Sequence, residues 1–199
     1  MDDLDPTVDT VTGVPAANGS RRPGAGRRSQ AVIAGAGLLA VAALAFLAWT
    51  WRHPSAFDGY AGNEVGRPHS NVGETTYVGI TMPNDQITGS VTIHGADPHG
   101  LTDSTGATFA YYLCTPDPGP AGSWLGIGTE SDLPETCDQI VPATGAEMSL
   151  TEQQVIIAIT PAHEGTVVLH GLDLHYSDGW QNGTQRVGLD VRIRVPNRG

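Results

Sequence analysis

The sequence predicts an all-β protein attached to a membrane: an antiparallel, immunoglobulin-like sandwich preceded by one transmembrane helix. Residues 31–51 form an uncharged apolar run, and from residue 75 short β-type runs alternate with Gly, Pro and Asp. No segment after the apolar run has a convincing helical period. We therefore expect a disordered cytoplasmic tail at 1–30, a transmembrane helix at 31–51, an extracytoplasmic stalk at 52–74 and a β-sandwich domain at 75–199.

The apolar run has the length of a membrane span. It contains 21 residues with one hydroxyl, that of Thr50. At ~1.5 Å per residue, a helix of this length matches a bilayer core of ~30 Å. Only Arg52 follows the run at once, whereas four arginines precede it closely: Arg21, Arg22, Arg27 and Arg28. Positive charge resists translocation, so we expect a cytoplasmic N-terminus and an extracytoplasmic C-terminal domain in the cell membrane.

A cleaved signal peptide is the alternative to a retained anchor. Its apolar region would span ~7–15 residues and end at a site of the A-x-A type. The nearest such site, Ala43-Leu44-Ala45, lies inside the run. We therefore expect a signal-anchor that is kept in a single-pass protein. Small residues spaced four apart in the run leave self-association open.

The part of the chain beyond the anchor is acidic. From His53 onward it carries 17 of the 21 acidic residues and five of the ten arginines, giving a formal charge of −12. Such a surface repels nucleic acid and anionic lipid headgroups, so a nucleic-acid partner is not expected. The charge suits a cationic partner, but solubility explains it more simply.

Two cysteines, Cys114 and Cys137, stand 23 positions apart in the exported part. A lone pair of cysteines outside the cytoplasm most simply forms a disulfide, which would stabilise the domain by roughly 3 kcal/mol. The alternatives are two free thiols or a redox site. Redox chemistry is disfavoured because the pair has no C-x-x-C spacing.

The predicted strands are short and frequent. They cover residues 76–81, 88–94, 108–114, 154–160, 166–176 and 185–195, with a short one near 125–128. In the last run apolar Val187, Leu189 and Val191 alternate with polar residues, which is typical of a half-buried strand. The apolar positions of 166–176 change parity near His170-Gly171, which predicts a β-bulge there.

Two tryptophans are candidate binding residues. Trp124 lies in the Pro- and Gly-rich loop between the cysteines, where it would either recognise a partner or, as we favour, plug the end of the sandwich. Trp180 lies in the link 177–184 between the last two strands. It would either bind a partner or fold back onto the sheet, and the sequence does not decide between these.

Histidines raise the question of a metal site. Asp173 and His175 would share the outward face of a strand, and His94 or His99 from another strand would complete a weak candidate site. The spacing of five between His94 and His99 is odd, however, and so matches no pair on one strand face. The same holds for His170 and His175. Scattered surface histidines are therefore the preferred interpretation.

The chain lacks the familiar signatures of catalysis, namely the G-x-S-x-G, H-E-x-x-H, P-loop and dinucleotide motifs. Ser177 and Asp178 stand near His175, but triads assemble in space rather than in sequence. We therefore expect no enzymatic activity, no catalytic residues and no cofactor.

The arginine-flanked span, the Pro- and Gly-containing stalk and the acidic, lysine-free β-domain resemble single-pass envelope proteins of high-GC bacteria with an exported β-sandwich. The stretch LDLHYSDGWQNGTQRVGLDVRIRV is similar to the ends of such domains. The resemblance implies a location and a fold, and no activity. Together these features predict a membrane-anchored interaction domain, an accessory subunit that binds another envelope protein. The alternatives are an exported ligand- or metal-binding domain and an enzyme of unrecognised type.

Overall fold

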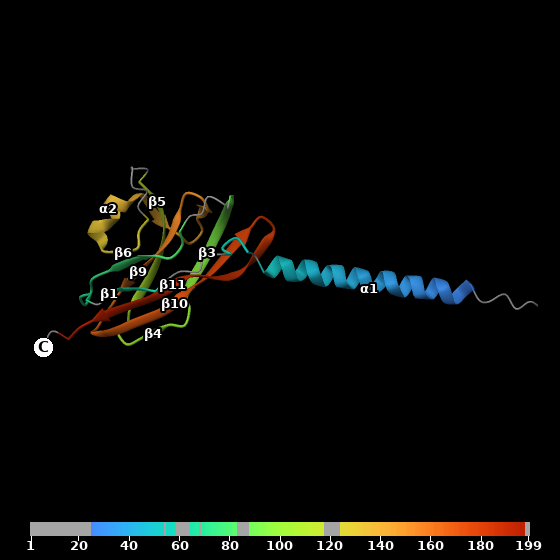
Figure 1. Ribbon diagram of the computed structural model, residues 1–199, viewed down its shortest axis with the longest axis horizontal. Coiled ribbons are helices and arrows are strands. Elements are labelled where there is room, and N and C mark those ends of the chain that lie inside the picture. Colours follow the sequence, from blue (N-terminus) through green and yellow to red (C-terminus); the bar gives the residue numbers. More distant parts are fainter. Residues whose placement is uncertain are drawn as a thin grey trace, which may run out of the picture. The chain divides into compact units, whose positions relative to one another are not determined.

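Most of the described chain lies in strands. The computed structural model describes residues 25–53, 55–58, 64–67, 69–82, 88–117 and 124–197, with side chains from Leu38 onward. The helices are α1 (Ala25–Arg52), the 3-10 helix η1 (Glu130–Asp132) and α2 (Leu133–Thr136). The strands are β1 (Val65–Arg67), β2 (Thr76–Gly79), β3 (Ser90–Pro98), β4 (Thr102–Asp103), β5 (Thr108–Pro116), β6 (Ile127–Gly128), β7 (Cys137–Pro142), β8 (Glu147–Ser149), β9 (Gln154–Thr160), β10 (Gly165–Asp178) and β11 (Gln181–Val195) (Figure 1).

Helix α1 begins before the predicted transmembrane segment. Its backbone includes residues 25–30, which we had assigned to the disordered tail, and the rest of that tail lies outside the described residues. Arginine, glutamine and alanine in this stretch are good helix formers, which explains the extension. Contacts divide the chain into two units, residues 1–43 and 44–199, and all the strands belong to the second. No helix among the described residues is long and apolar enough to count as a membrane span.

The strands form two sheets. The first has the order β1-β11-β10-β3-β8, with β4 also paired to β10, and the second has the order β6-β2-β9-β5-β7. All pairings are antiparallel except that of β1 with β11, which is parallel. The predicted all-β fold of two sheets is confirmed, and the expectation of purely antiparallel strands is wrong at this one edge.

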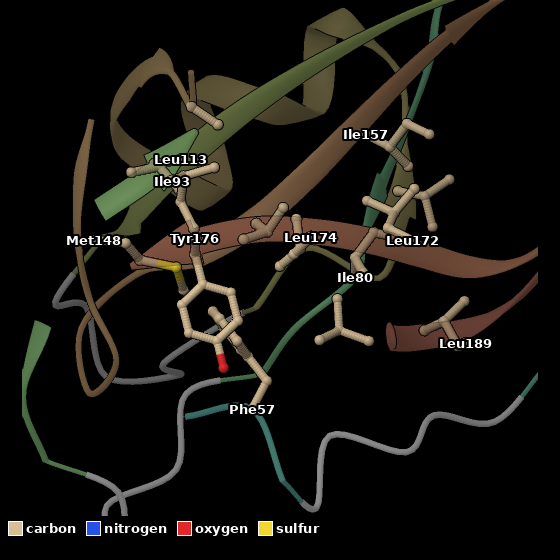
Figure 2. Packing of buried hydrophobic residues seen from close by; sticks show 14 of the residues in the cluster. Phe57, Ile80, Ile93, Leu113, Met148, Ile157, Leu172, Leu174, Tyr176 and Leu189 are labelled. Atoms are coloured by element: carbon tan, nitrogen blue, oxygen red, sulfur yellow. The ribbon is translucent and has the colours of Figure 1, made fainter. Parts of the chain in front are cut away.

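The two sheets share one hydrophobic core (Figure 2). Ile93 and Leu174 from the first sheet and Leu113 and Ile157 from the second are at most 1% exposed. Burying each such side chain contributes roughly 1.5–3 kcal/mol, so this layer supplies most of the favourable free energy of folding.

The predicted alternation of β11 is confirmed. Its apolar residues are buried, with Leu189 at 7% exposed and Ile193 fully buried, whereas Arg192 and Arg194 are exposed. The predicted irregularity near His170-Gly171 is also confirmed, because the register of β10 with β11 shifts between His170 and Leu172; Gly188 and Leu189 of β11 lie opposite Gly171, so the extra residue of this bulge is in β11.

Several described residues of the stretch 52–74, which we expected to be a stalk, pack into or pair with the sandwich. Phe57 is 2% exposed and packs edge-on against Tyr176, with ring centroids 4.9 Å apart. Strand β1 adds an edge to the first sheet, and Ser70 is buried while its backbone N–H donates to the carbonyl oxygen of Arg194. The sequence pattern did not reveal these residues. A single buried side chain or a strand of three residues is too short to produce a recognisable alternation of apolar and polar positions.

The disulfide between Cys114 and Cys137 is present, with their Cα atoms 5.5 Å apart. Both cysteines are buried in a second cluster whose other members are Leu125, Leu133 and Ile156. Gln154 joins the loop to β9 inside this cluster. Its side-chain amide donates to the carbonyl oxygen of Leu125 at 2.9 Å, and its oxygen accepts from the N–H of Leu125 at 3.1 Å. The disulfide therefore supports a packed cap as well as closing a loop.

We predict that Leu189→Ala lowers the free energy of unfolding by about 2–5 kcal/mol, because the change removes buried methyl groups and leaves a cavity. Arg192→Ala should cost at most about 0.5 kcal/mol, since Arg192 is exposed and lies 3.8 Å from Glu64 in a pair open to solvent. Denaturant unfolding of the purified full chain measures both. Equal losses at the two positions would contradict the assigned faces of β11.

We predict that Cys114→Ala lowers the free energy of unfolding by about 2–4 kcal/mol, because the unfolded chain regains the entropy that the cross-link removes. Thermal unfolding with and without a reductant measures the loss. The Cys137→Ala variant and the double variant should lose a similar amount, since any of the three changes removes the same cross-link. As a check, the natural protein is unfolded in the presence of the reductant, so that the disulfide can be reduced, and is then refolded. An unchanged melting temperature after this treatment would contradict the stabilising role of the disulfide.

Candidate functional site

The outer face of the first sheet carries a group of histidines and aspartates. We call this group the histidine face: His94, Asp97, His99, His170, Asp173, His175 and Asp190. Strand β3, the residue after it, and strands β10 and β11 supply these side chains. They lie opposite the core, because their strand neighbours Ile93, Leu172 and Leu174 are fully buried.

Two β-bulges bring the histidines to one face. Between β10 and β11 the bulge at Gly171 places His170 and His175 on the same side of β10 although they are five residues apart. In β3 the pairing with β10 shifts between Gly95 and Ile93, so that His94 is the extra residue. Our expectation that an odd spacing separates these histidines is therefore wrong. It holds only for a strand without a bulge.

Three histidines of this face each contact a carboxylate. The Nδ1 atom of His99 lies 2.9 Å from Asp173, and the Nε2 atom of His175 lies 2.9 Å from Asp97. The third pair joins His170 to Asp190. All six side chains are about a third or more exposed, so solvent screens the pairs. They align neighbouring strands while remaining accessible from outside.

Further polar contacts extend this network across the strands. His175 uses its other ring nitrogen to contact the hydroxyl of Thr184 at 2.7 Å. Arg186 donates from Nε to the backbone carbonyl oxygen of His170 at 2.9 Å. These contacts join β10 to β11 and fix the imidazole of His175 from two sides.

The four weak metal candidates do not form one site. Asp173 contacts His99, whereas His175 contacts Asp97 and His94 contacts a serine. Within the described ranges, no three side chains of the metal-binding types converge. Asp97 and Asp173 thus each contact one imidazole, in two separate pairs.

Ser177 and His94 form a pair that sequence reasoning missed. The Oγ atom of Ser177 lies 3.0 Å from Nε2 of His94, whereas the sequence suggested His175 as its neighbour. A nucleophilic serine also needs a group that orients the histidine. In the part of the chain that the structure describes, no carboxylate bonds to the second ring nitrogen of His94. Alternation with buried Val91 and Ile93 directs His94 outward, but the sequence does not show that β3 lies beside Ser177 of β10.

The two candidate tryptophans differ in exposure. Trp180 is 60% exposed at the tip of the β10–β11 hairpin, so it does not fold back onto the sheet. Trp124, which lies between the two bonded cysteines in the sequence, is partly buried. Trp180 is therefore the better placed of the two to meet a partner.

An open hollow of about 750 Å³ lies beside the base of this hairpin tip. The lining residues include three histidines and one tryptophan: Trp51, Arg52, His53, His94, His175, Asn182, Gly183 and Thr184. Comparisons with protein-family models, curated proteins and solved structures find no match to this chain. The hollow can receive polar or aromatic groups, and it adjoins the histidine face through His94 and His175.

A buried tyrosine joins the segment after α1 to the hairpin. The hydroxyl of Tyr176 accepts a hydrogen bond from the backbone N–H of Ala56 at 3.0 Å and donates to the side-chain oxygen of Gln185 at 2.6 Å. Gln185 in turn donates to Asp58 and accepts from the backbone N–H of Phe57. Burial raises the pKa of Tyr176 to about 12, because the tyrosinate would lose its hydration. Figure 2 shows the hydroxyl directed toward Phe57.

We predict that Tyr176→Phe lowers the free energy of unfolding by about 1–3 kcal/mol, because it leaves the buried N–H of Ala56 without its partner. Tyr112→Phe, at a half-buried tyrosine of β5, is the matched control and should cost less. Denaturant unfolding measures both, and equal costs would contradict the role of the Tyr176 hydroxyl.

The same tyrosine predicts a loss of stability in alkali. Its pKa is raised on folding from 10.0 to about 12, so its contribution is fully present below pH 10 and is lost as the pH rises toward 12. Unfolding measured across this interval should show a steeper loss in the natural protein than in Tyr176→Phe.

Proposed function

We propose that this chain is a single-pass, membrane-anchored protein of the bacterial envelope. Its immunoglobulin-like β-sandwich lies outside the cytoplasm and binds another envelope protein as an accessory subunit, without catalysing a reaction. The apolar run at 31–51 supports the anchor, and the arginines before it support a cytoplasmic N-terminus. The disulfide supports an oxidising compartment for the domain.

The observation that carries the proposal is the short path from α1 into the sandwich core. Phe57 is the fifth residue after Arg52 and is almost fully buried. Tyr176 and Gln185 hold this segment through hydrogen bonds to the backbone N–H groups of Ala56 and Phe57. A domain attached so closely to a membrane span has little reach. It would therefore meet its partner at the membrane surface, which suits a subunit of a membrane assembly.

The histidine face is the surface that we propose for this partner. It is broad, partly exposed and rich in hydrogen-bonding groups, as the rims of protein interfaces are. Its cross-strand contacts limit how much the side chains must be ordered on binding, which lowers the entropic cost of association.

We predict that protease added to intact spheroplasts removes the β-domain and spares the N-terminal tail. Antibodies against tags at the two ends report the result, and permeabilised cells, which should lose both tags, serve as the control. The orientation follows from the arginine asymmetry around the run. Digestion of the tail instead, or a mature protein that begins near Arg52, would overturn the proposed anchor.

Site-specific photo-crosslinking then tests the surface. A photoreactive residue at exposed His94 or His170 should capture one discrete partner in native membranes. The same residue at exposed Gln139, on β7 of the other sheet, should not. Equal capture at all three positions would show that the histidine face has no special role, and capture only at Gln139 would place the interface on the other sheet.

A further inference from the structure

The β10–β11 hairpin ends in an exposed tryptophan. Asp178 pairs with Gln181, so Gly179 and Trp180 form a two-residue turn. Gly179 has a φ of 54°, a conformation that glycine adopts at no steric cost. The turn therefore projects Trp180, which is 60% exposed. An indole left in water forfeits the burial of a large apolar ring, so an exposed tryptophan at a tip indicates a contact surface.

The residue after Trp180 contacts the last turn of α1. The side-chain amide of Gln181 donates a hydrogen bond of 2.9 Å to the backbone carbonyl oxygen of Thr50. The same carbonyl oxygen also accepts from the backbone N–H of His53 at 3.3 Å, so the hairpin contact adds a second donor to the end of the helix. The hairpin tip and the end of α1 thus lie side by side.

The end of α1 carries two more exposed tryptophans. Trp49 is 59% exposed and Trp51 is 43% exposed. The guanidinium of Arg52 lies 6.0 Å from the ring centroid of Trp51, within range of a cation–π contact. Tryptophan favours the boundary between lipid and water because its ring is apolar and its N–H is polar.

We propose that the tip of the β10–β11 hairpin is a second membrane contact, in which Trp180 enters the lipid headgroup region beside the end of the span. This inference rests on the proposed membrane anchor. Because the exported part is acidic, the contact depends on the indole and suits zwitterionic lipid. With the span and the tip both held, the domain has one preferred orientation on the membrane.

The test uses the full-length chain in phosphatidylcholine vesicles whose acyl chains carry bromine, a quencher of tryptophan emission at short range. Three variants each retain a single tryptophan: Trp180, Trp49 or Trp124. In each variant the other three of the four tryptophans are replaced by phenylalanine. We expect quenching of Trp180 and Trp49, and none of Trp124. Unbrominated vesicles provide the reference intensity for each variant.

The outcomes separate this proposal from the anchor on which it rests. Quenched Trp49 with unquenched Trp180 overturns the lipid contact and keeps the anchor, leaving the tip to a protein partner. Unquenched Trp49 overturns the anchor itself. Quenching of Trp124 to the same extent as Trp180 would show unspecific adsorption and also overturn the contact.

The single variant Trp180→Phe guards against misfolding of the multiple variants. In this otherwise natural chain, the share of emission that brominated lipid quenches should fall relative to the unmodified protein. Trp124→Phe is the matched control and should leave the quenched emission unchanged. No fall in Trp180→Phe would overturn the proposal even if a multiple variant fails to fold.

Discussion

The bulge at Gly171 determines which side chains of β10 face the core. Leu169 lies before it and Leu172 after it, and both are fully buried although three positions separate them. Gly171 has a φ of 91°, and a Cβ atom there would lie 2.5 Å from the carbonyl oxygen of Val187. Only glycine fits this position without moving β11. If β10 and β11 paired in a regular register throughout, the leucines on one side of Gly171 would face solvent instead of the core.

The same bulge shapes the outer surface. By changing parity it places His170 on the side that also carries Asp173 and His175, next to Asp190 of β11. The second bulge, at His94, adds an imidazole from β3 opposite Ser177. Core packing and the composition of the candidate surface are therefore coupled. The same bulges that keep the apolar side chains in the core also decide which polar side chains share the outer face.

Local pattern explains how much of this architecture could be predicted. Strand β9 has the predicted bounds and β11 the predicted faces, because the preferences of these runs agree with their burial. The burial of Phe57 could not be predicted, because it depends on Tyr176, far along the chain. The contacts of the histidine face were missed for a related reason. Each joins residues 20 to 83 positions apart, and the bulge in β3 leaves no signature that alternation can detect.

The parallel pairing of β1 with β11 gives the domain a mechanical property. Val65, Gly66 and Arg67 pair with Val191, Arg192 and Ile193 while both strands run in the same direction. Tension applied between the chain before β1 and the chain after β11 would draw the two strands past each other along their length. The hydrogen bonds between them would then be loaded together in shear rather than opened one after another. A bound partner that pulls on the C-terminal end would thus load this strand pair in shear, together with the pairing of β11 with β10, and β1 would resist extraction of the last strand.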